Sequence, residues 1–133
     1  MGQPAAKQND TIVAVDTHIV MVPSPGGPVP TPLPHPFNGI ISSGLSGDVN
    51  IMGFAAATVG SVADNTPPHI PTPPGTAFQT PPKNKGTIRL GSQTVKINGK
   101  SAARNGDVAD TCNDPADAPV GKVIAVSTVM IGG

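Results

Sequence analysis

Apolar and polar residues alternate over short stretches of this chain, and turn-forming residues separate the stretches. Val95 and Ile97 fall on one side of an extended backbone, while Lys96 and Asn98 fall on the other. Asn98 is followed by Gly99, a pair typical of two-residue hairpin turns because both residues tolerate positive φ. The pattern therefore predicts a strand, a tight turn and a second strand.

Further strands and two proline-rich loops are expected elsewhere. Similar patterns predict strands at Thr11–Val15, His18–Val22, Thr87–Leu90 and Val123–Val126. Two stretches, 23–36 and 67–82, carry seven prolines each. Proline cannot donate to a sheet ladder, so neither stretch can be a central strand. Because proline also lowers the entropy of an ordered loop, we expect two stiff proline-rich loops wrapped over one end of the body.

A repeat organises the chain. The segment that begins at Val49 matches the segment that begins at Val95 without a gap, at an offset of 46 residues. A third copy is visible because Ala5–Asp10 matches Ala102–Asp107, and the strand missing in front of it occurs at the other end of the chain, in 128–133. The first repeat is thus split between the termini. We expect the fold to bring the termini together in an approximately three-fold arrangement.

Composition favours strands and turns over helices. The chain has 16 glycines and 17 prolines, and its eight acidic residues are all aspartate. Glutamate, a common helix residue, is missing. We predict an all-β fold in a single domain, 1–133, which is a length suited to one domain.

The core is short of large side chains. The chain has no tryptophan or tyrosine and three phenylalanines, so the residues that dominate burial in most cores are nearly missing. Small scaffolds with weak cores commonly use disulfides, a metal or assembly. The single cysteine excludes an internal disulfide. A metal, or assembly onto a partner, is what remains.

The charge balance excludes some partners. A formal net charge of zero gives no electrostatic attraction to nucleic acid or to an anionic membrane. The N-terminal residues lack the basic and apolar regions of a secretory signal, and no apolar stretch reaches the length of a membrane span. We therefore expect synthesis without a signal peptide.

The candidate metal ligands are the chain's three histidines and its one cysteine: His18, His35, His69 and Cys112. Equivalent repeat positions are occupied by Asp10, Ser61 and Asp107. His18 and His69 lie eight residues after the first and second of these, and Cys112 lies five residues after the third. A three-fold body would bring these three side chains toward its axis, and His35 would reach in from the first proline-rich loop.

Three imidazoles and a thiolate suit one tetrahedral metal. Zn²⁺ binds such N and S ligands at about 2.0–2.3 Å, and iron is the less favoured choice. Four protein ligands leave no position for water, so the site would be structural and would contribute directly to folding.

The segment 92–107 resembles the proline-alanine-alanine-arginine (PAAR) repeat family, whose members tip contractile injection machines. The resemblance rests on Ser101–Arg104 (SAAR), with Val95–Gly99 before it and Gly106-Asp107 after it. Pro4–Lys7 (PAAK) is a second version and Phe54–Thr58 (FAAAT) a degenerate third. No copy reads PAAR in full, and the long proline-rich loops are not typical of the family. The chain therefore resembles a divergent, PAAR-like member.

The resemblance implies a conical fold of short β-hairpins in three pseudo-three-fold repeats. Its broad base would cap a trimeric VgrG-like β-helical spike, one monomer per trimer, and a structural zinc would clamp the sharp tip for membrane puncture. On this sequence the zinc ligands would be His18, His35, His69 and Cys112. Candidates for the docking base are Val49, Ile51, Val95, Ile97, Val129 and Ile131.

The same resemblance implies partners and a location. Effector or cargo proteins would be further partners, the target membrane a transient contact, and nucleic acid no partner. The machine would be a type VI secretion system, another contractile injection system or a phage tail-like particle. It would carry the protein from the bacterial cytoplasm to the extracellular space or a target cell.

Two other function classes stay open. A zinc-dependent hydrolase would need Cys112 to stay unbound and Asp16 or Asp64 to act as general base. A nucleophile pair of Cys112 with a histidine lacks an identifiable oxyanion loop. A metal-free adaptor would use the P-x-x-P spacing of the proline-rich stretches. We expect a structural protein that is not an enzyme.

Overall fold

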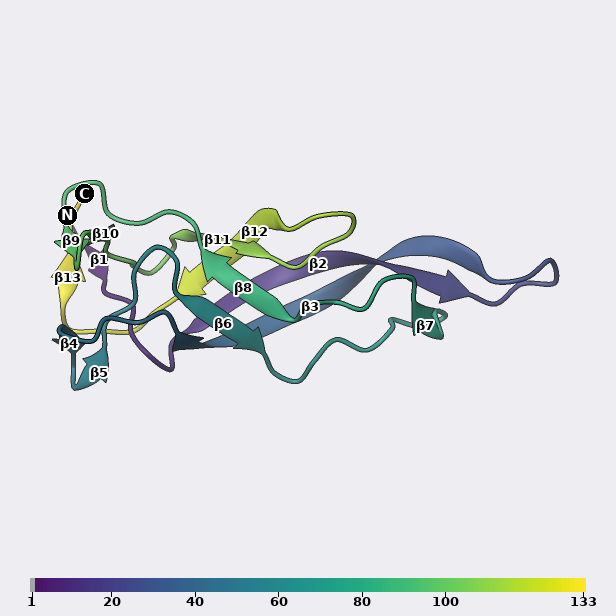
Figure 1. The fold of residues 1–133 in the computed structure, drawn as a ribbon, viewed down its shortest axis with the longest axis horizontal. Coiled ribbons are helices and arrows are strands. Elements are labelled where there is room, and N and C mark those ends of the chain that lie inside the picture. The colour runs from purple at the N-terminus through teal and green to yellow at the C-terminus, as the bar shows by residue number, and fades with distance from the viewer. Residues whose placement is uncertain (1) are drawn as a thin grey trace.

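The structure is a computed structural model that describes residues 2–133, and the fold is all-β (Figure 1). The strands are β1 (Gln3–Pro4), β2 (Thr11–Val22), β3 (Val29–Ser43), β4 (Asn50–Ile51), β5 (Phe54–Ala55), β6 (Val62–Asn65), β7 (Ala77–Phe78), β8 (Lys85–Ile88), β9 (Lys96–Ile97), β10 (Lys100–Ser101), β11 (Val108–Thr111), β12 (Ala118–Ile124) and β13 (Met130–Ile131). Met1, part of the expected domain 1–133, lies outside the described residues. Residues 2–133 contain no helix, and hence none long and apolar enough to cross a membrane.

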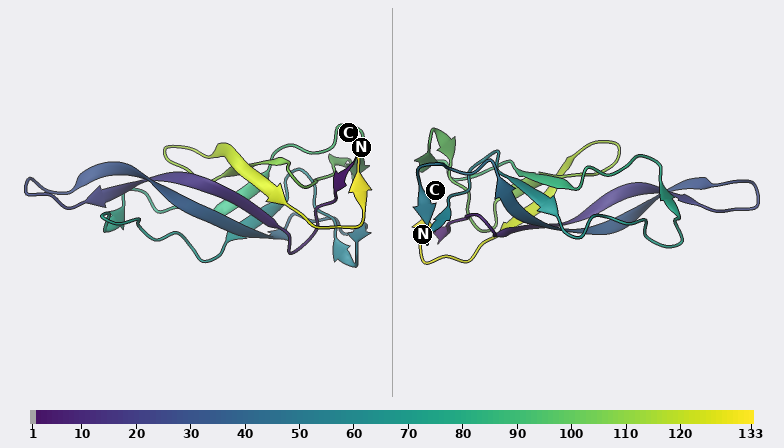
Figure 2. Two further views of the ribbon diagram at one scale, coloured as in Figure 1. Left: turned by 180° about the vertical axis from the view of Figure 1, so that it is seen from behind. Right: turned by 60° about the horizontal axis from the view of Figure 1, so that its bottom comes forward.

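Six strands close into an antiparallel barrel. β2, β3, β6, β8, β11 and β12 pair in this order, and β12 pairs again with β2. Each repeat supplies two neighbouring strands: β2 with β3, β6 with β8, and β11 with β12. The first pair is much longer than the others, so β2 and β3 project beyond the barrel as a two-stranded ribbon (Figures 1 and 2). The strands predicted at 11–15 and 18–22 are the two halves of β2.

A ring of three alanines lies at the end of the barrel opposite this ribbon. The N–H of Ala6 donates to the carbonyl of Ala103, that of Ala103 to Ala57, and that of Ala57 to Ala6, at 2.9, 3.1 and 3.0 Å. These residues occupy one position in the three repeats, and all three are fully buried. The repeat found in the sequence is therefore an approximate three-fold repeat in space, as predicted.

Three short hairpins form the broad end around this ring. β4–β5 and β9–β10 turn through Met52-Gly53 and Asn98-Gly99, and all four turn residues have positive φ. The third hairpin is β1 paired with β13, which joins the two ends of the chain (Figure 1). This pairing confirms that one repeat is split between the termini. A small core fills the hairpins with equivalent residues of each repeat: Ala5, Ala56, Ala102, Ile51, Ile97 and Ile131.

Glycines keep the barrel narrow. Gly39, Gly86 and Gly121 lie at equivalent places in the three repeats, one in each of β3, β8 and β12. A Cβ added at Gly39 would lie 2.7 Å from the Phe37 ring, and one at Gly121 would lie 2.8 Å from Thr111 Cγ2. Since the barrel has no room for more side chains here, one phenylalanine and small aliphatic residues suffice to fill it. The barrel core includes Ile12, Phe37, Ile41, Ala63, Ile88, Ala109 and Val123.

The first proline-rich stretch is a strand over most of its length, where the sequence predicted a loop. β3 begins at Val29 and pairs with β2 in unbroken register up to Ile40. Prolines occupy alternate positions of β3, at residues 30, 32, 34 and 36. Alternate residues of a strand direct their backbone N–H and C=O to the same side. The missing N–H groups therefore all lie along one edge of β3.

This edge is the one that faces away from β2. Asn38, in phase with the prolines, donates its N–H to Asn65 of β6, and the carbonyl of Pro34 accepts from the Thr72 hydroxyl. The ladder with β2 uses only the residues between the prolines and is intact. The second proline-rich stretch, 67–82, is mainly loop, as expected, apart from Ala77–Phe78, which adds to β2.

Replacing Gly39 by alanine will test the packing of the barrel. We expect Gly39→Ala to lower the free energy of unfolding by about 1–3 kcal/mol, because the new methyl group overpacks the Phe37 ring. Gly47→Ala is the matched control, since its Cβ would meet nothing within 4 Å. Urea unfolding measures both variants. Equal stabilities for the two variants would contradict a barrel without spare room.

Restoring N–H donors to the outer edge of β3 will test the role of its prolines. Exposed edge strands with free donors can pair with other chains. We expect the double variant Pro30→Thr, Pro32→Thr to associate as its concentration rises, measured as mass by light scattering. Pro25→Thr, in the hairpin turn and outside the ladder, is the control. A double variant that keeps the mass of the unmodified protein at all concentrations would contradict edge protection.

Candidate metal centre

The three ligand candidates identified by repeat phase come from three parts of the fold. His18 lies on β2, His69 in the loop after β6, and Cys112 directly after β11. His18 is on the inward-facing side of its strand, where buried residues alternate with more exposed ones. The His69 backbone is fixed by its N–H, which donates to Asn84 Oδ1 at 2.8 Å. All three side chains are almost completely buried.

These residues converge with Asp16 into one compact cluster. One ligand atom from each of Asp16, His18, His69 and Cys112 lies within 4.8 Å of the others. Cys112 Sγ is 3.6 Å from His18 Nε2 and 3.4 Å from Asp16 Oδ2. His69 Nε2 is 2.8 Å from the same carboxylate oxygen. The structure thus brings together three of the four predicted ligands and adds a carboxylate.

The spacing of these atoms fits a tetrahedral metal. With Zn–N near 2.1 Å and Zn–S near 2.3 Å, an imidazole nitrogen and a sulfur on one zinc lie about 3.6 Å apart. Cys112 Sγ and His18 Nε2 are separated by that distance. Imidazole nitrogen, thiolate and carboxylate are all ligands that Zn²⁺ accepts. The buried cluster could therefore hold a metal ion.

The second ring nitrogen of His18 is buried and faces a carboxylate. Its Nδ1 has no hydrogen-bond partner within residues 2–133, although it lies 3.4 Å from Asp114 Oδ2. That carboxylate is held in place by the N–H of Ile19 at 2.8 Å. Metal-bound histidines usually direct their second N–H to a carboxylate. His18, with Nε2 toward Cys112 and Nδ1 toward Asp114, has this arrangement.

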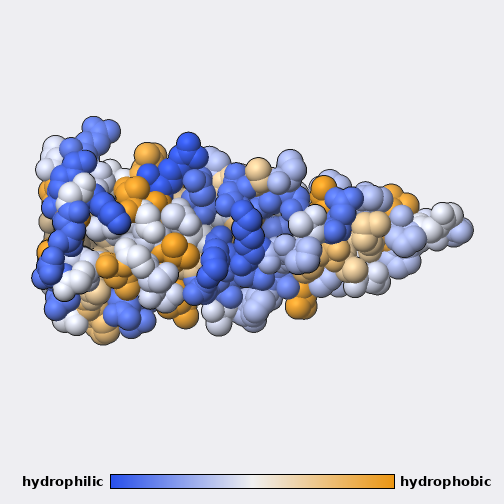
Figure 3. Space-filling view, viewed as in Figure 1, coloured by the Kyte–Doolittle hydropathy of each residue, from blue (hydrophilic) through white to orange (hydrophobic). Residues whose placement is uncertain are grey.

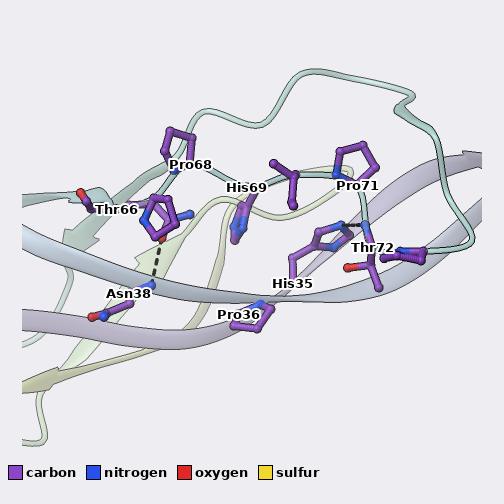
Figure 4. Close-up of a pocket in the computed structure, with 12 residues that line it drawn as sticks. His35, Pro36, Asn38, Thr66, Pro68, His69, Pro71 and Thr72 are labelled. Carbon is purple, nitrogen blue, oxygen red and sulfur yellow. Dashed lines mark hydrogen bonds between the residues drawn. The ribbon is translucent and has the colours of Figure 1, made fainter.

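His35 lies beside the cluster, but both of its ring nitrogens have other partners. Its ring centroid is 5.4 Å from that of His18 and 5.6 Å from that of His69. Nδ1 is 2.9 Å from the Leu33 carbonyl oxygen, and Nε2 is 3.1 Å from the backbone nitrogen of Thr72 (Figure 4). A carbonyl only accepts and an amide N–H only donates, so Nδ1 carries the proton. Burial also lowers the pKa of His35, which favours the neutral ring. A ligand role for His35 stays a prediction.

Asp16 is the residue whose place the sequence did not predict. The sequence suggested Asp16 only as a general base of the alternative zinc-dependent hydrolase. In the structure it is fully buried, and its Oδ1 accepts from the Thr111 hydroxyl and lies 3.4 Å from Asn113 Nδ2. Asp16 and His18 are two residues apart on one strand and therefore share a face. That two-residue spacing is the feature of the sequence that could have placed Asp16 beside His18.

The other base considered, Asp64, lies elsewhere. It is exposed on β6, where it pairs with Lys85 at 2.6 Å. Hydrogen bonds from Lys85 and Ser42 lower the pKa of its carboxyl group. Asp64 belongs neither to the cluster nor to the proline-walled pocket of about 380 Å³ beside His35 and His69 (Figure 4).

Burial controls the chemistry of the cysteine. Burial, and then the neighbouring Asp16 charge, raise the pKa of the Cys112 thiol to about 11. Without a metal the thiol keeps its proton near neutral pH and donates it to Asp16 Oδ2. Such a thiol is a poor nucleophile, whereas a metal ion can displace the proton and bind the thiolate. The site is better suited to metal binding than to covalent catalysis.

Comparison with known proteins assigns no family. No protein-family model matches the chain, and no curated protein matches it. Evidence for the function of this chain therefore comes from the symmetry of the fold and the chemistry of the cluster.

Loss of the metal should lower stability. We expect about one zinc per chain in the purified protein by elemental analysis. A metal that binds only the folded state stabilises it by about 2.7 kcal/mol at a hundredfold excess over Kd. Cys112→Ser removes the thiolate at nearly constant size, so the variant should lose this stabilisation by the metal. A chelator should therefore lower the melting temperature of the unmodified protein but not that of the variant. A metal-free, fully folded protein that is indifferent to added zinc would contradict the metal centre.

Proposed function

We propose that this chain is a PAAR-like structural tip protein that caps the trimeric VgrG-like β-helical spike of a contractile injection machine. The observation that carries the proposal is the ring of hydrogen bonds between Ala6, Ala57 and Ala103. It gives a single chain three similar sides around one axis. Such a chain can fit the end of a true trimer with one monomer per trimer, which a chain with one binding side cannot do.

The shape of the molecule supports the same proposal. One end is broad and carries both termini, and the molecule narrows toward the ribbon of β2 and β3 (Figures 1 and 3). In a conical PAAR-type fold, the broad end would contact the spike and the ribbon would form the point. Prolines on the outer edge of the ribbon would keep the point from pairing with other strands.

Apolar side chains at the broad end supply a docking surface for the spike. The base hairpins expose Met52, Phe54 and Met130 by 52, 42 and 56%, and they also expose Val49 and Val129. Of the docking candidates from the sequence, the isoleucines at 51, 97 and 131 are buried in the small core of the base, and Val95 packs against that core. We therefore assign docking to the exposed residues of the hairpins.

The metal has a mechanical role in this proposal. His18, His69 and Cys112 belong to the first, second and third repeat, so one ion would tie all three together where the barrel passes into the ribbon. We propose Zn²⁺ rather than iron, because a closed N, S and O site suits an ion without redox chemistry. The protein would be structural and not an enzyme.

The remaining assignments follow from the proposed machine. The protein would assemble in the bacterial cytoplasm and leave with the injection apparatus, contact the target membrane transiently, and accompany effector or cargo proteins. Nucleic acid would not be a partner, which agrees with the zero net charge.

A charge placed on the base should weaken spike binding. We expect Met130→Asp to lower affinity for the cognate trimeric spike at least tenfold, because a buried unpaired charge at an interface is costly. Val15→Asp, on the outside of the barrel and 63% exposed, is the matched control. Native mass spectrometry should show one chain per spike trimer. Three chains per trimer, or no binding by the unmodified protein, would contradict the proposal.

A further inference from the structure

We propose that Asp16, through Oδ2, rather than His35, supplies the fourth ligand of the metal centre. The ligand set is then His18, His69, Cys112 and Asp16. It differs from the three-histidine set that the family resemblance implies. The inference rests on the metal centre of the proposed function and assigns its coordination.

The position of Asp16 Oδ2 is the first argument. This oxygen lies 2.8 Å from His69 Nε2 and 3.4 Å from Cys112 Sγ, between two atoms that a metal would bind. A carboxylate oxygen and a thiolate sulfur bound to one tetrahedral zinc lie about 3.6 Å apart, so Oδ2 already has nearly the spacing of a ligand relative to Cys112 Sγ. An ion bound to His69 Nε2 and Cys112 Sγ would have Oδ2 beside it, so Oδ2 must bind that ion or move away.

Asp16 cannot easily move away. Its side chain is fully buried, and its other oxygen accepts from the Thr111 hydroxyl and lies 3.4 Å from the Asn113 side-chain amide. These contacts hold Oδ1 and direct Oδ2 into the cluster. Hydrogen bonds of this kind, behind a ligand, orient metal-binding carboxylates in general.

Charge supports the same assignment. In the part of the chain that the structure describes, the partners of the Asp16 carboxylate include no lysine or arginine. A buried carboxylate whose partners include no permanently charged cation is unfavourable. Zn²⁺ bound by one thiolate and one carboxylate is neutral, and direct coordination brings the opposite charges closest together.

His35 has a different task in this arrangement. Its Nε2 accepts the N–H of Thr72, whose hydroxyl donates to the Pro34 carbonyl (Figure 4). His35 therefore fastens the second proline-rich stretch to β3. Binding a metal through Nε2 would break this contact, and Nδ1 already donates to the Leu33 carbonyl.

The two ligand sets can be distinguished by replacing Asp16 or His35 and measuring the absorption spectrum of bound Co²⁺. In Asp16→Cys the longer metal–sulfur bond compensates for the shorter side chain. If Asp16 is a ligand, this variant should bind Co²⁺ with about twice the sulfur-to-cobalt charge-transfer intensity of the unmodified protein, because a second thiolate coordinates. His35→Gln is the control and should keep both the spectrum and the stoichiometry of the unmodified protein.

X-ray absorption on zinc-loaded, unmodified protein gives a test that needs no variant to fold. We expect one sulfur and three nitrogen or oxygen neighbours, with outer-shell scattering from two imidazoles. Three imidazoles, an unchanged charge-transfer intensity in a metal-loaded Asp16→Cys protein, or loss of the metal in His35→Gln would each overturn the assignment of Asp16. Those results leave the tip function intact. Failure of the unmodified protein to bind any metal would overturn this inference together with the metal clamp, while spike binding would still be tested separately.

Discussion

The hydrogen-bonded ring of Ala6, Ala57 and Ala103 is the constraint on which the rest of the molecule depends. Three segments of one chain approach a common axis there, and each is fully buried, so each must carry a very small side chain. Three residues further on, each segment turns back through a residue of positive φ: Asn9, Gly60 and Gly106. From this point every repeat has one hairpin at the base and two strands in the barrel. Symmetry at the ring thus places six strands and three hairpins at once.

The repeats are similar at the ring and differ with distance from it. Their turns use the same contact, in which a side chain accepts the N–H three residues earlier: Asp10 from Lys7, Ser61 from Thr58 and Asp107 from Arg104. Beyond the barrel the first repeat extends into a long ribbon, the second into a proline-rich loop and the third into a short loop. The buried polar cluster lies where these unlike segments meet, in the region that symmetry no longer organises. A metal there would supply the order that the repeated backbone contacts supply at the other end.

Local patterns allowed much of this architecture to be predicted. The hairpin turn at Asn98-Gly99, the split first repeat and the convergence of His18, His69 and Cys112 each follow from residue spacing. Two features could not be read in this way. Pro30–Pro36 forms a strand because only one side of β3 needs donors there, and the sequence does not state which side of a strand has a partner. The spacing of Asp16 from His18 indicates only a shared strand face; its carboxylate joins the cluster through contacts with residues 95 and 96 positions away, which depend on barrel closure.

The pairing of β1 with β13 has a topological consequence. A strand from each end of the chain completes a hairpin that the other two repeats form from continuous backbone. The three units therefore follow one another cyclically around the axis, and the fold has no unit that is intrinsically first or last. The chain could be joined at Gly2 and Gly132 by a short linker and opened in another surface turn without altering the order of neighbours around the barrel. The order of the three units around the axis is therefore cyclic, and the break in the backbone lies in the hairpin of β1 and β13 at the base.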